Sequence, residues 1–379
     1  MFPVTVVGSW PRSPELLRAQ KQKRRGLLPE VEFEALADAA VLEALRIQEE
    51  VGVDIVSDGE QRRDSFFSFV ADKLDGVEMM TLAEMLEIIE DKAGFERILQ
   101  TLDVPAYSIS NATCTGRIRR AKPLACHEAE FLRRHTERPI KVPLPGPYLM
   151  TRAMFVREAC RGVYDSKEEV GDEVVKVLRA EVEDLLAIGV DFIQFDEPVL
   201  TEVVFTQGQA RTFMCAALAA SKDPTAELEF AVDLMNRVLA GFDSTSRGAR
   251  VGVHVCRGNW SQDESTLLRG SYDPLIPYLD RMAVDQTVLE YATERAGDVI
   301  ALAGKELGLG VVNPRTERIE TADEILHSVE RALEVYPPER LFLNPDCGFA
   351  TFSNRPVNSV EIARSKLEAT VAAARRLRG

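Results

Sequence analysis

The sequence has few cysteines and none of the segments that mark secreted or membrane proteins. Six cysteines in 379 residues are too few for a disulfide framework, so free thiols are expected. No apolar run approaches the roughly 18–20 residues of a membrane span. The first ten residues, MFPVTVVGSW, also lack the basic region and long apolar stretch of a signal peptide. We therefore expect a cytoplasmic protein with no membrane partner.

Positive charge is also in deficit. Lys+Arg 46 against Asp+Glu 61 gives a net charge of −15, without the basic face of a nucleic-acid-binding protein. No G-x-G-x-x-G or G-x-x-x-x-G-K-[ST] motif follows an expected strand, which argues against an open nucleotide-binding sheet. No repeat, low-complexity tract or linker divides the chain, so we expect a single domain over residues 1–379.

Short β-branched runs alternate with amphipathic stretches, which is typical of a parallel α/β protein. Eight such runs match the number of strands in a closed barrel. We therefore predict an α/β fold, a (β/α)₈ TIM barrel. Its expected strands are Val4–Ser9, Asp54–Gly59, Ile140–Gly146, Asp191–Pro198, Val251–Cys256, Gln286–Ala292, Leu307–Val312 and Leu341–Gly348.

Two helix starts can be read from capping-box patterns, one from Ser166 to Glu169 and one from Thr321 to Glu324. The interval from Gln61 to Pro139 is too long for one barrel helix. It contains a helical segment, Leu82–Leu99, and a β-like piece, Pro105–Ser110. We predict that about residues 61–139 form an insertion after the second strand.

Polar residues gather at the carboxyl ends of the expected strands, where barrel enzymes carry their active sites. His254 and Cys256 are two apart on one strand, so both side chains should point the same way. With Glu290 and Cys347 they form a donor set suited to zinc. The alternative is a core histidine beside a buried cysteine. A structural zinc is disfavoured because Cys-x-x-Cys knuckles are absent.

A zinc ion held in this way could bind an incoming thiol and lower its pKa, which points to alkyl transfer to sulfur. Glu60, Asp196 and Glu202 could hold a cation such as the ammonium of an amino acid, although surface acids are the alternative. Ser9 and nearby backbone N–H groups could hold its carboxylate. The other cysteines are interpreted as packing residues: Cys114, Cys126, Cys160 and Cys215.

The chain resembles the catalytic barrel of the cobalamin-independent methionine synthase family. The resemblance is carried, in order, by Val7-Gly8-Ser9-Trp10-Pro11, Asp58-Gly59-Glu60, Ile193-Gln194-Phe195-Asp196-Glu197-Pro198, His254-x-Cys256 and Asn344-Pro345-Asp346-Cys347-Gly348. It implies a zinc-dependent S-methyltransferase that converts homocysteine to methionine, like 5-methyltetrahydropteroyltriglutamate-homocysteine S-methyltransferase. It places zinc on His254, Cys256, Glu290 and Cys347, homocysteine on Ser9, Glu60, Asp196 and Glu202, and catalysis on His254, Cys256, Cys347 and Asp196.

The sequence departs from the family pattern in three places. There is room for one barrel, whereas full-length members have two. The segment from Pro145 to Arg152 replaces a Trp-Ser-Phe segment, and Val312-Asn313-Pro314-Arg315 replaces a segment with a histidine. The alkyl donor therefore stays open between a methylfolate, a methylcorrinoid and an epoxide.

Two other functions are weighed against methyl transfer. The related epoxyalkane:coenzyme M transferases use zinc to activate a sulfonate thiol, and Arg152 or Arg315 could pair with the sulfonate. A non-catalytic barrel that binds metal or an amino acid is the third possibility. The carboxylates favour homocysteine, because they suit an ammonium group and repel a sulfonate.

Overall fold

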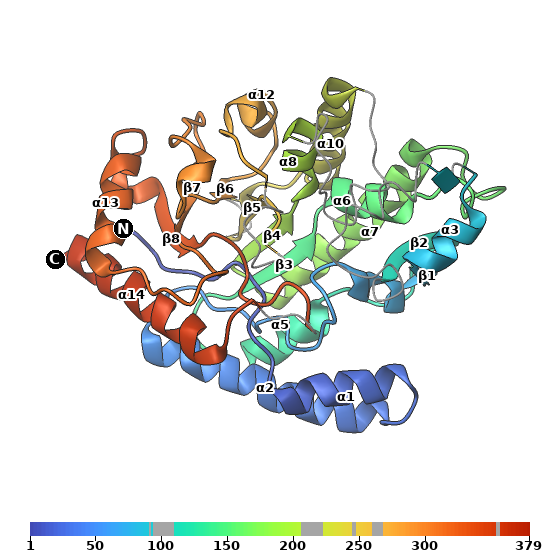
Figure 1. Ribbon diagram of the computed structural model, residues 1–379, viewed down its shortest axis with the longest axis horizontal. Coiled ribbons are helices and arrows are strands. Elements are labelled where there is room, and N and C mark those ends of the chain that lie inside the picture. Colours follow the sequence, from blue (N-terminus) through green and yellow to red (C-terminus); the bar gives the residue numbers. More distant parts are fainter. Residues whose placement is uncertain (91, 94–109, 206–222, 245–247, 260–267, 354–356) are drawn as a thin grey trace.

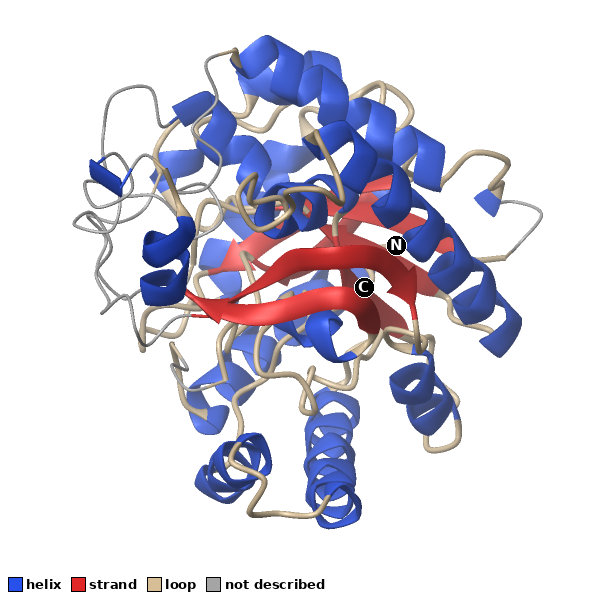
Figure 2. Cartoon of the chain, turned by 90° about the vertical axis from the view of Figure 1, so that its right-hand side faces the viewer, coloured by secondary structure: helices blue, strands red, loops and turns tan. Residues whose placement is uncertain are grey.

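The computed structural model describes residues 1–90, 92–93, 110–205, 223–244, 248–259, 268–353 and 357–379 (Figure 1). Six parallel strands form one sheet in chain order, and all six were predicted from the sequence. They are β3 (Lys141–Pro145), β4 (Phe192–Asp196), β5 (Arg250–Val255), β6 (Gln286–Leu289), β7 (Glu306–Val312) and β8 (Leu341–Pro345). Figure 2 shows the strands surrounded by helices.

Isolated parallel bridges complete the ring between β8 and β3. Val4 bridges Leu343 of β8, Thr5 bridges Ile55, and Val56 bridges Ile140, the residue before β3. Eight segments thus follow one another around a barrel, as predicted.

The first two segments are shorter than predicted, because each pairs with its neighbours only through single bridges. Side chains take the place of a strand ladder beyond the bridges. Lys141 Nζ donates to Val6 O at 2.9 Å, and Gln194 Nε2 donates to Val7 O at 3.0 Å. These backbone carbonyls have hydrogen-bond donors without a neighbouring strand. The chain is therefore free to turn towards the end of the barrel where the strands have their carboxyl ends.

The helices begin largely where the sequence predicts. Ser166 caps α7 (Lys167–Ile188) by accepting from Glu169 N, but the Glu169 carboxylate accepts from Asp165 N, so only half of the predicted box forms. The box at α13 (Ala322–Leu333) is complete. The other helices are α1 (Pro14–Arg24), α2 (Glu30–Val51), α3 (Leu82–Ile88), α5 (Cys126–Arg133), α6 (Pro147–Met154), α8 (Val199–Phe205), α10 (Pro224–Val238), α12 (Ile276–Leu279) and α14 (Val360–Arg378).

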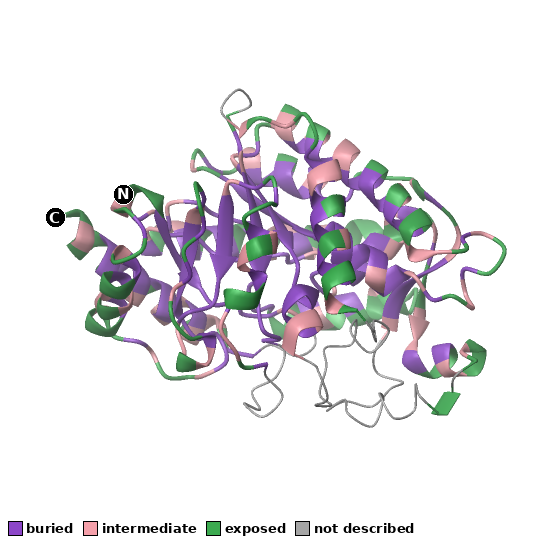
Figure 3. Cartoon of the chain, turned by 90° about the horizontal axis from the view of Figure 1, so that it is seen from above, coloured by how far each residue is buried: buried purple, intermediate pink, exposed green. Residues whose placement is uncertain are grey.

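Burial follows the barrel pattern. The six strands of the parallel sheet are almost wholly buried, whereas the helices present exposed residues on their outer faces (Figure 3). α1 packs on the first half of α2, and the second half of α2 packs into the main core, so α1 and the start of α2 project from the barrel (Figures 1 and 2). None of the helices in the described ranges is long and apolar enough to span a lipid bilayer.

The predicted insertion contains an antiparallel pair, β1 (Leu74–Thr81) and β2 (Ser110–Arg120), together with α3 and α5. The helix predicted over Leu82–Leu99 is interrupted after Ile88, because Ile89 has extended backbone angles, and residues 92–93 are again helical. Residues 94–99 lie outside the described residues. The predicted β-like piece Pro105–Ser110 also lies outside them, except for Ser110, which begins β2.

A repeated contact stabilises the amino ends of the strands. Three aspartates lie just before or at the start of the second, fourth and sixth barrel segments: Asp54, Asp191 and Asp285. Each carboxylate accepts a hydrogen bond from a backbone N–H group of the preceding segment. The bonds come from Val4 N at 2.7 Å, Ile140 N at 2.8 Å and Val251 N at 2.8 Å. These N–H groups lie at the barrel's end, where a parallel ladder gives them no partner.

Candidate metal centre

Three metal-ligand side chains meet at the carboxyl ends of the strands. His254 lies in β5, Cys256 follows that strand directly, and Cys347 follows β8. Their ligand atoms all lie within 4.8 Å of one another, and all three residues are buried. His254 and Cys256 reach the same cluster, as their spacing along the strand predicts.

The imidazole of His254 is oriented for metal binding. Nδ1 lies 3.0 Å from Val288 O on the neighbouring strand β6, so Nδ1 carries the proton and donates it. Nε2 is buried and has no hydrogen-bond partner among the described residues. Its lone pair is therefore available to a cation, and an imidazole with two thiols is a donor set that fits zinc.

The two thiols have different acidities. The neighbouring Cys347 thiol, together with His254, lowers the pKa of Cys256 well below its ordinary value. Contact with Cys256 raises the pKa of Cys347, because a second thiolate beside the first is disfavoured. A bound divalent cation would remove this repulsion.

Glu290, the predicted fourth ligand, lies outside the three-residue cluster. Its carboxylate accepts from Arg257 N at 3.0 Å, from Arg295 NH2 at 2.8 Å and from the Asn259 side chain. Burial acts to raise the pKa of Glu290, but Arg295 and Arg257 outweigh it and the pKa is lowered. Its role as a ligand stays a prediction.

A narrow cleft opens on the metal cluster and brings together most of the predicted site. It is lined by Val7, Ser9, Glu60, Phe66, Asp196, Pro198, His254, Cys256, Gly258, Asn259, Cys347, Gly348 and Thr351. Among the predicted substrate residues, Ser9, Glu60 and Asp196 line it. Glu202 is buried in α8 and is not part of the lining.

Glu60 enters the cleft from a left-handed backbone conformation. Gly59 has φ 68° and Glu60 has φ 54°, an uncommon pair that turns the glutamate inward. Gly8 allows the close approach, since a Cβ there would collide with the Glu60 carboxylate. Burial raises the pKa of Glu60 to about 8, with Arg63 opposing and Asp196 adding to the shift. Oε2 is buried and has no partner among the described residues.

Asp196 ends β4 beside His254, its register partner on β5. Gln194 Nε2 donates to Asp196 Oδ1 at 2.8 Å. Burial raises the pKa of Asp196 to about 6, although His254 and Gln194 both act to lower it. Glu60 and Asp196 thus present two carboxylates to the cleft, which suits a cationic group on a ligand.

Sequence reasoning missed residues that support this cleft. Arg12 is buried and donates to Ala350 O at 3.1 Å and to Glu60 O, so it ties together the loops that follow the first, second and last strands. Gln194 was also missed as a functional residue. Both residues lie in or directly after motifs that the sequence analysis singled out, but their partners are far away along the chain.

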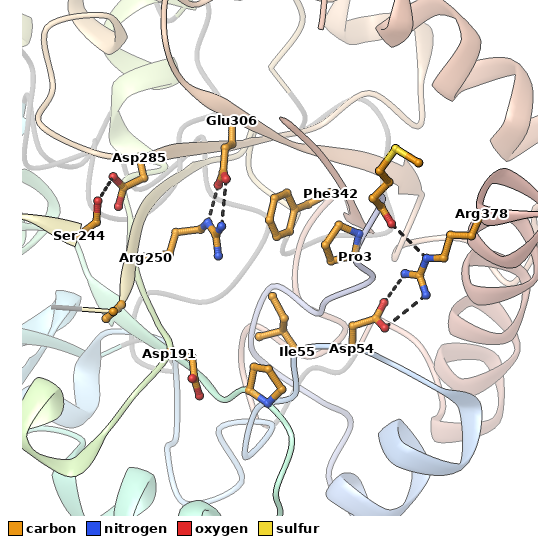
Figure 4. Close-up of a pocket in the computed structure, with 14 residues that line it drawn as sticks. Pro3, Asp54, Ile55, Asp191, Ser244, Arg250, Asp285, Glu306, Phe342 and Arg378 are labelled. Carbon is orange, nitrogen blue, oxygen red and sulfur yellow. Dashed lines mark hydrogen bonds and ion pairs between the residues drawn. The ribbon is translucent and has the colours of Figure 1, made fainter. Parts of the chain in front are cut away.

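A larger cavity of about 820 Å³ lies at the opposite, amino end of the strands (Figure 4). Its charged residues are already engaged: Asp54 with Arg378, Arg250 with Glu306, and Asp285 with Ser244 and Val251 N. We therefore place the functional site in the smaller cleft, where Glu60 Oε2 and His254 Nε2 have no hydrogen-bond partner among the described residues.

Comparison with known proteins decides the family. The sequence model described as "Cobalamin-independent synthase, Catalytic domain" matches residues 2–376. The chain belongs to this family. Methionine synthase of Pyrococcus abyssi is 31% identical over 97% of this chain and 94% of its own length. The 5-methyltetrahydropteroyltriglutamate–homocysteine methyltransferase of Thermotoga maritima is 25% identical, and the match covers 93% of this chain but 42% of that protein.

Solved structures agree with the cobalamin-independent synthase assignment. A B12-independent methionine synthase from Shewanella, in complex with selenomethionine, has a TM-score of 0.75 and 25% identity over 100% of this chain and 98% of its own. Another from Listeria monocytogenes has a TM-score of 0.72 at 20% identity, which supports the fold. The chain is accordingly an enzyme, and the prediction of a methionine synthase-like methyltransferase is confirmed over the non-catalytic alternative.

The other predicted residues divide into three groups. Arg152 lies 3.6 Å from Glu227, and Arg315 donates to Asn259 at 3.0 Å, so both have protein partners and neither lines the cleft. Cys114, Cys126 and Cys160 are buried away from the metal cluster, which agrees with packing roles. Cys215 lies outside the described residues.

Proposed function

We propose that this protein transfers a methyl group to the sulfur of homocysteine and forms methionine in a zinc-dependent reaction. One observation carries the proposal: the His254–Cys256–Cys347 cluster opens into a cleft that also holds the carboxylates of Glu60 and Asp196. A thiol and an ammonium group on one small substrate match these two sets of residues. We further propose that the chain is one domain and acts in the cytoplasm.

His254, Cys256 and Cys347 would hold the zinc. Glu290 is proposed as a fourth ligand, supported by its electrostatic influence on both cysteines. A zinc ion at this place lowers the pKa of a bound thiol, so that the thiolate exists at neutral pH. The β6 carbonyl of Val288 fixes the tautomer of His254 and so keeps its Nε2 available.

Glu60 and Asp196 would accept hydrogen bonds from the substrate ammonium, and Glu202 of α8 is proposed as a further substrate-binding residue. Ser9 and neighbouring backbone N–H groups would bind the substrate carboxylate. The Shewanella relative supports this assignment, since its structure contains selenomethionine, the selenium form of the proposed product.

We propose a methyltetrahydropteroyl compound as the methyl donor, supported by the name of the Thermotoga relatives. The sulfur–methyl bond forms as the donor's nitrogen–methyl bond breaks, and the donor nitrogen gains a proton. No relative named here supports an epoxide or a methylcorrinoid. The engaged states of Arg152 and Arg315 also disfavour a sulfonate thiol.

The test is a matrix of thiols and alkyl donors with the purified protein. Homocysteine and coenzyme M are each combined with a methyltetrahydropteroyl glutamate, a methylcorrinoid and a small epoxide, and products are identified by mass spectrometry. Methionine formed from homocysteine with the folate donor is the expected result. Turnover of coenzyme M with the epoxide, and none of homocysteine, would overturn the proposal.

A further inference from the structure

We propose that Lys141 and Gln194 are positioning residues that fix the carboxylate of Asp196 towards the ammonium group of the substrate. The inference rests on the proposed function, because it assigns the geometry that selects an amino-acid thiol. Neither residue lines the cleft. They act from the interior of the barrel, below the site.

Lys141 is a buried amine at the start of β3, with 1% of its surface exposed, and burial lowers its pKa to about 7 although Asp196 acts to raise it. Its Nζ donates to Val6 O at 2.9 Å and to Gln194 Oε1 at 3.1 Å, and it lies 4.3 Å from the ring centre of Phe192. Among the described residues it forms no ion pair. A polar group buried in this way is costly unless it is hydrogen-bonded, so the contacts it makes require an explanation beyond filling space.

Three neighbours set the orientation of the Gln194 amide. Lys141 donates to its oxygen, whereas Val7 O and the Asp196 carboxylate can only accept. The amide nitrogen then faces the opposite way, where its two hydrogens reach Val7 O at 3.0 Å and Asp196 Oδ1 at 2.8 Å. Without Lys141, the amide oxygen would lose its donor, and one of the contacts that hold the amide against Asp196 would be lost.

This chain of bonds determines which oxygen of Asp196 is engaged. Gln194 contacts Oδ1, and the carboxylate lines the cleft beside Glu60 and His254. Oδ2 is then the oxygen that accepts a hydrogen bond from the substrate ammonium. The Gln194 amide nitrogen also donates to Val7 O, so Gln194 links Asp196 to the segment that carries Ser9, the proposed carboxylate-binding residue. Lys141 and Gln194 therefore fix the position of the ammonium-binding Asp196 relative to the segment that carries the carboxylate-binding Ser9.

The experiment compares two ligands that differ only in the amino group, L-homocysteine and 4-mercaptobutyrate. Their affinities are measured by titration calorimetry for the wild type, Lys141→Met, Gln194→Leu and the double variant, all loaded with zinc. Each single variant should weaken homocysteine binding about 10-fold, with 4-mercaptobutyrate affinity unchanged. The double variant should bind homocysteine as tightly as the single variant with the lower affinity does, because both residues act through one chain of bonds.

Lys305→Met is the matched control. Lys305 is also buried, and its Nζ donates to two carbonyls, Met282 O at 2.6 Å and Val284 O at 3.0 Å, but it has no bond towards Asp196. This variant should bind both ligands as the wild type does. Gln194→Glu should weaken homocysteine binding more than Gln194→Leu, because it places a second acceptor against Asp196 Oδ1.

The outcomes separate the inference from the proposed function. If the wild type does not bind homocysteine, the proposed function fails. If the wild type binds it and Gln194→Leu binds it equally well, the positioning role is wrong. Equal losses for both ligands would indicate general damage to the site and would also overturn the role. Should Lys141→Met fail to fold, Gln194→Leu and Gln194→Glu still decide the question.

Discussion

At the scale of single residues, Glu60 has a larger rise in pKa than Asp196, the other cleft carboxyl proposed to bind the ammonium. Burial raises the pKa of Glu60 to about 8, whereas the ordinary value is 4.5. The folded protein therefore binds one proton more than the unfolded chain between these two values. Stability falls as pH rises through this window, because the unfolded carboxylate ionises first. Holding Glu60 charged in the empty cleft costs free energy that a substrate ammonium would offset.

We predict that Glu60→Gln raises the stability of the ligand-free protein at pH 8–9 by about 2 kcal/mol or more, since each pKa unit corresponds to about 1.4 kcal/mol. The gain should shrink towards pH 5, where the native carboxyl is neutral as well. Melting temperatures measured across this range check the trend. A stability difference that does not change with pH would contradict the assigned pKa.

The metal cluster makes a second prediction at this scale. Cys347→Ser should lose most of the bound zinc, because it removes one of the three ligand atoms that cluster among the described residues. Cys114→Ser is the matched control, since Cys114 is equally buried but lies in β2 of the insertion. Elemental analysis of freshly purified protein measures both. Equal zinc content in the two variants would refute the assignment.

At the scale of secondary-structure elements, the amino ends of the strands depend on the repeated aspartate contact. Asp285→Ala should destabilise the protein by about 1–3 kcal/mol, because Val251 N is left without its acceptor. Asp285→Asn should lose less, since its side-chain oxygen can still accept. Urea denaturation distinguishes the two. Zinc content should stay unchanged in both, because this contact lies at the opposite end of the barrel.

The sequence predicted the elements that are defined by their own residues. The apolar runs of β3 to β8 stand out, and the Thr321–Glu324 box marks the start of α13. The first two segments were predicted too long. In the first, the carbonyls of Val6 and Val7 are satisfied by Lys141 and Gln194, which come much later in the chain. Such partners cannot be read from local periodicity.

The site, too, could be predicted only where it does not depend on partners that lie far away along the chain. The principle that active sites lie at the carboxyl ends of barrel strands brought His254, Cys256 and Cys347 together correctly, because it depends on topology alone. The engagement of Glu290 by Arg295 and Asn259 could not be foreseen, since it depends on loops whose paths the sequence does not specify.

At the scale of the whole molecule, the barrel closes through the chain's two ends. Arg378 of α14 donates to Phe2 O at 2.7 Å and to Met1 O at 3.1 Å, and it pairs with Asp54. The last helix thus holds the first segment, which pairs with β8 by one bridge and continues to Ser9 in the cleft.

Arg378→Met should therefore speed hydrogen exchange at Val4 and Thr5 and lower stability by about 1 kcal/mol, as expected for a partly exposed ion pair. Arg376→Met is the control, because Arg376 forms an exposed pair with Asp323 on the same helix and makes no contact with the first segment. Faster exchange at Val4 and Thr5 in both variants would contradict this role of Arg378.

The central claim is that the thiol of homocysteine binds at the cluster of His254, Cys256 and Cys347. X-ray absorption at the zinc edge, recorded with and without homocysteine, tests it most directly. We predict two sulfur neighbours in the free protein, one more when homocysteine is added, and no change with coenzyme M. An unchanged sulfur count with homocysteine, or an added sulfur only with coenzyme M, would contradict the account.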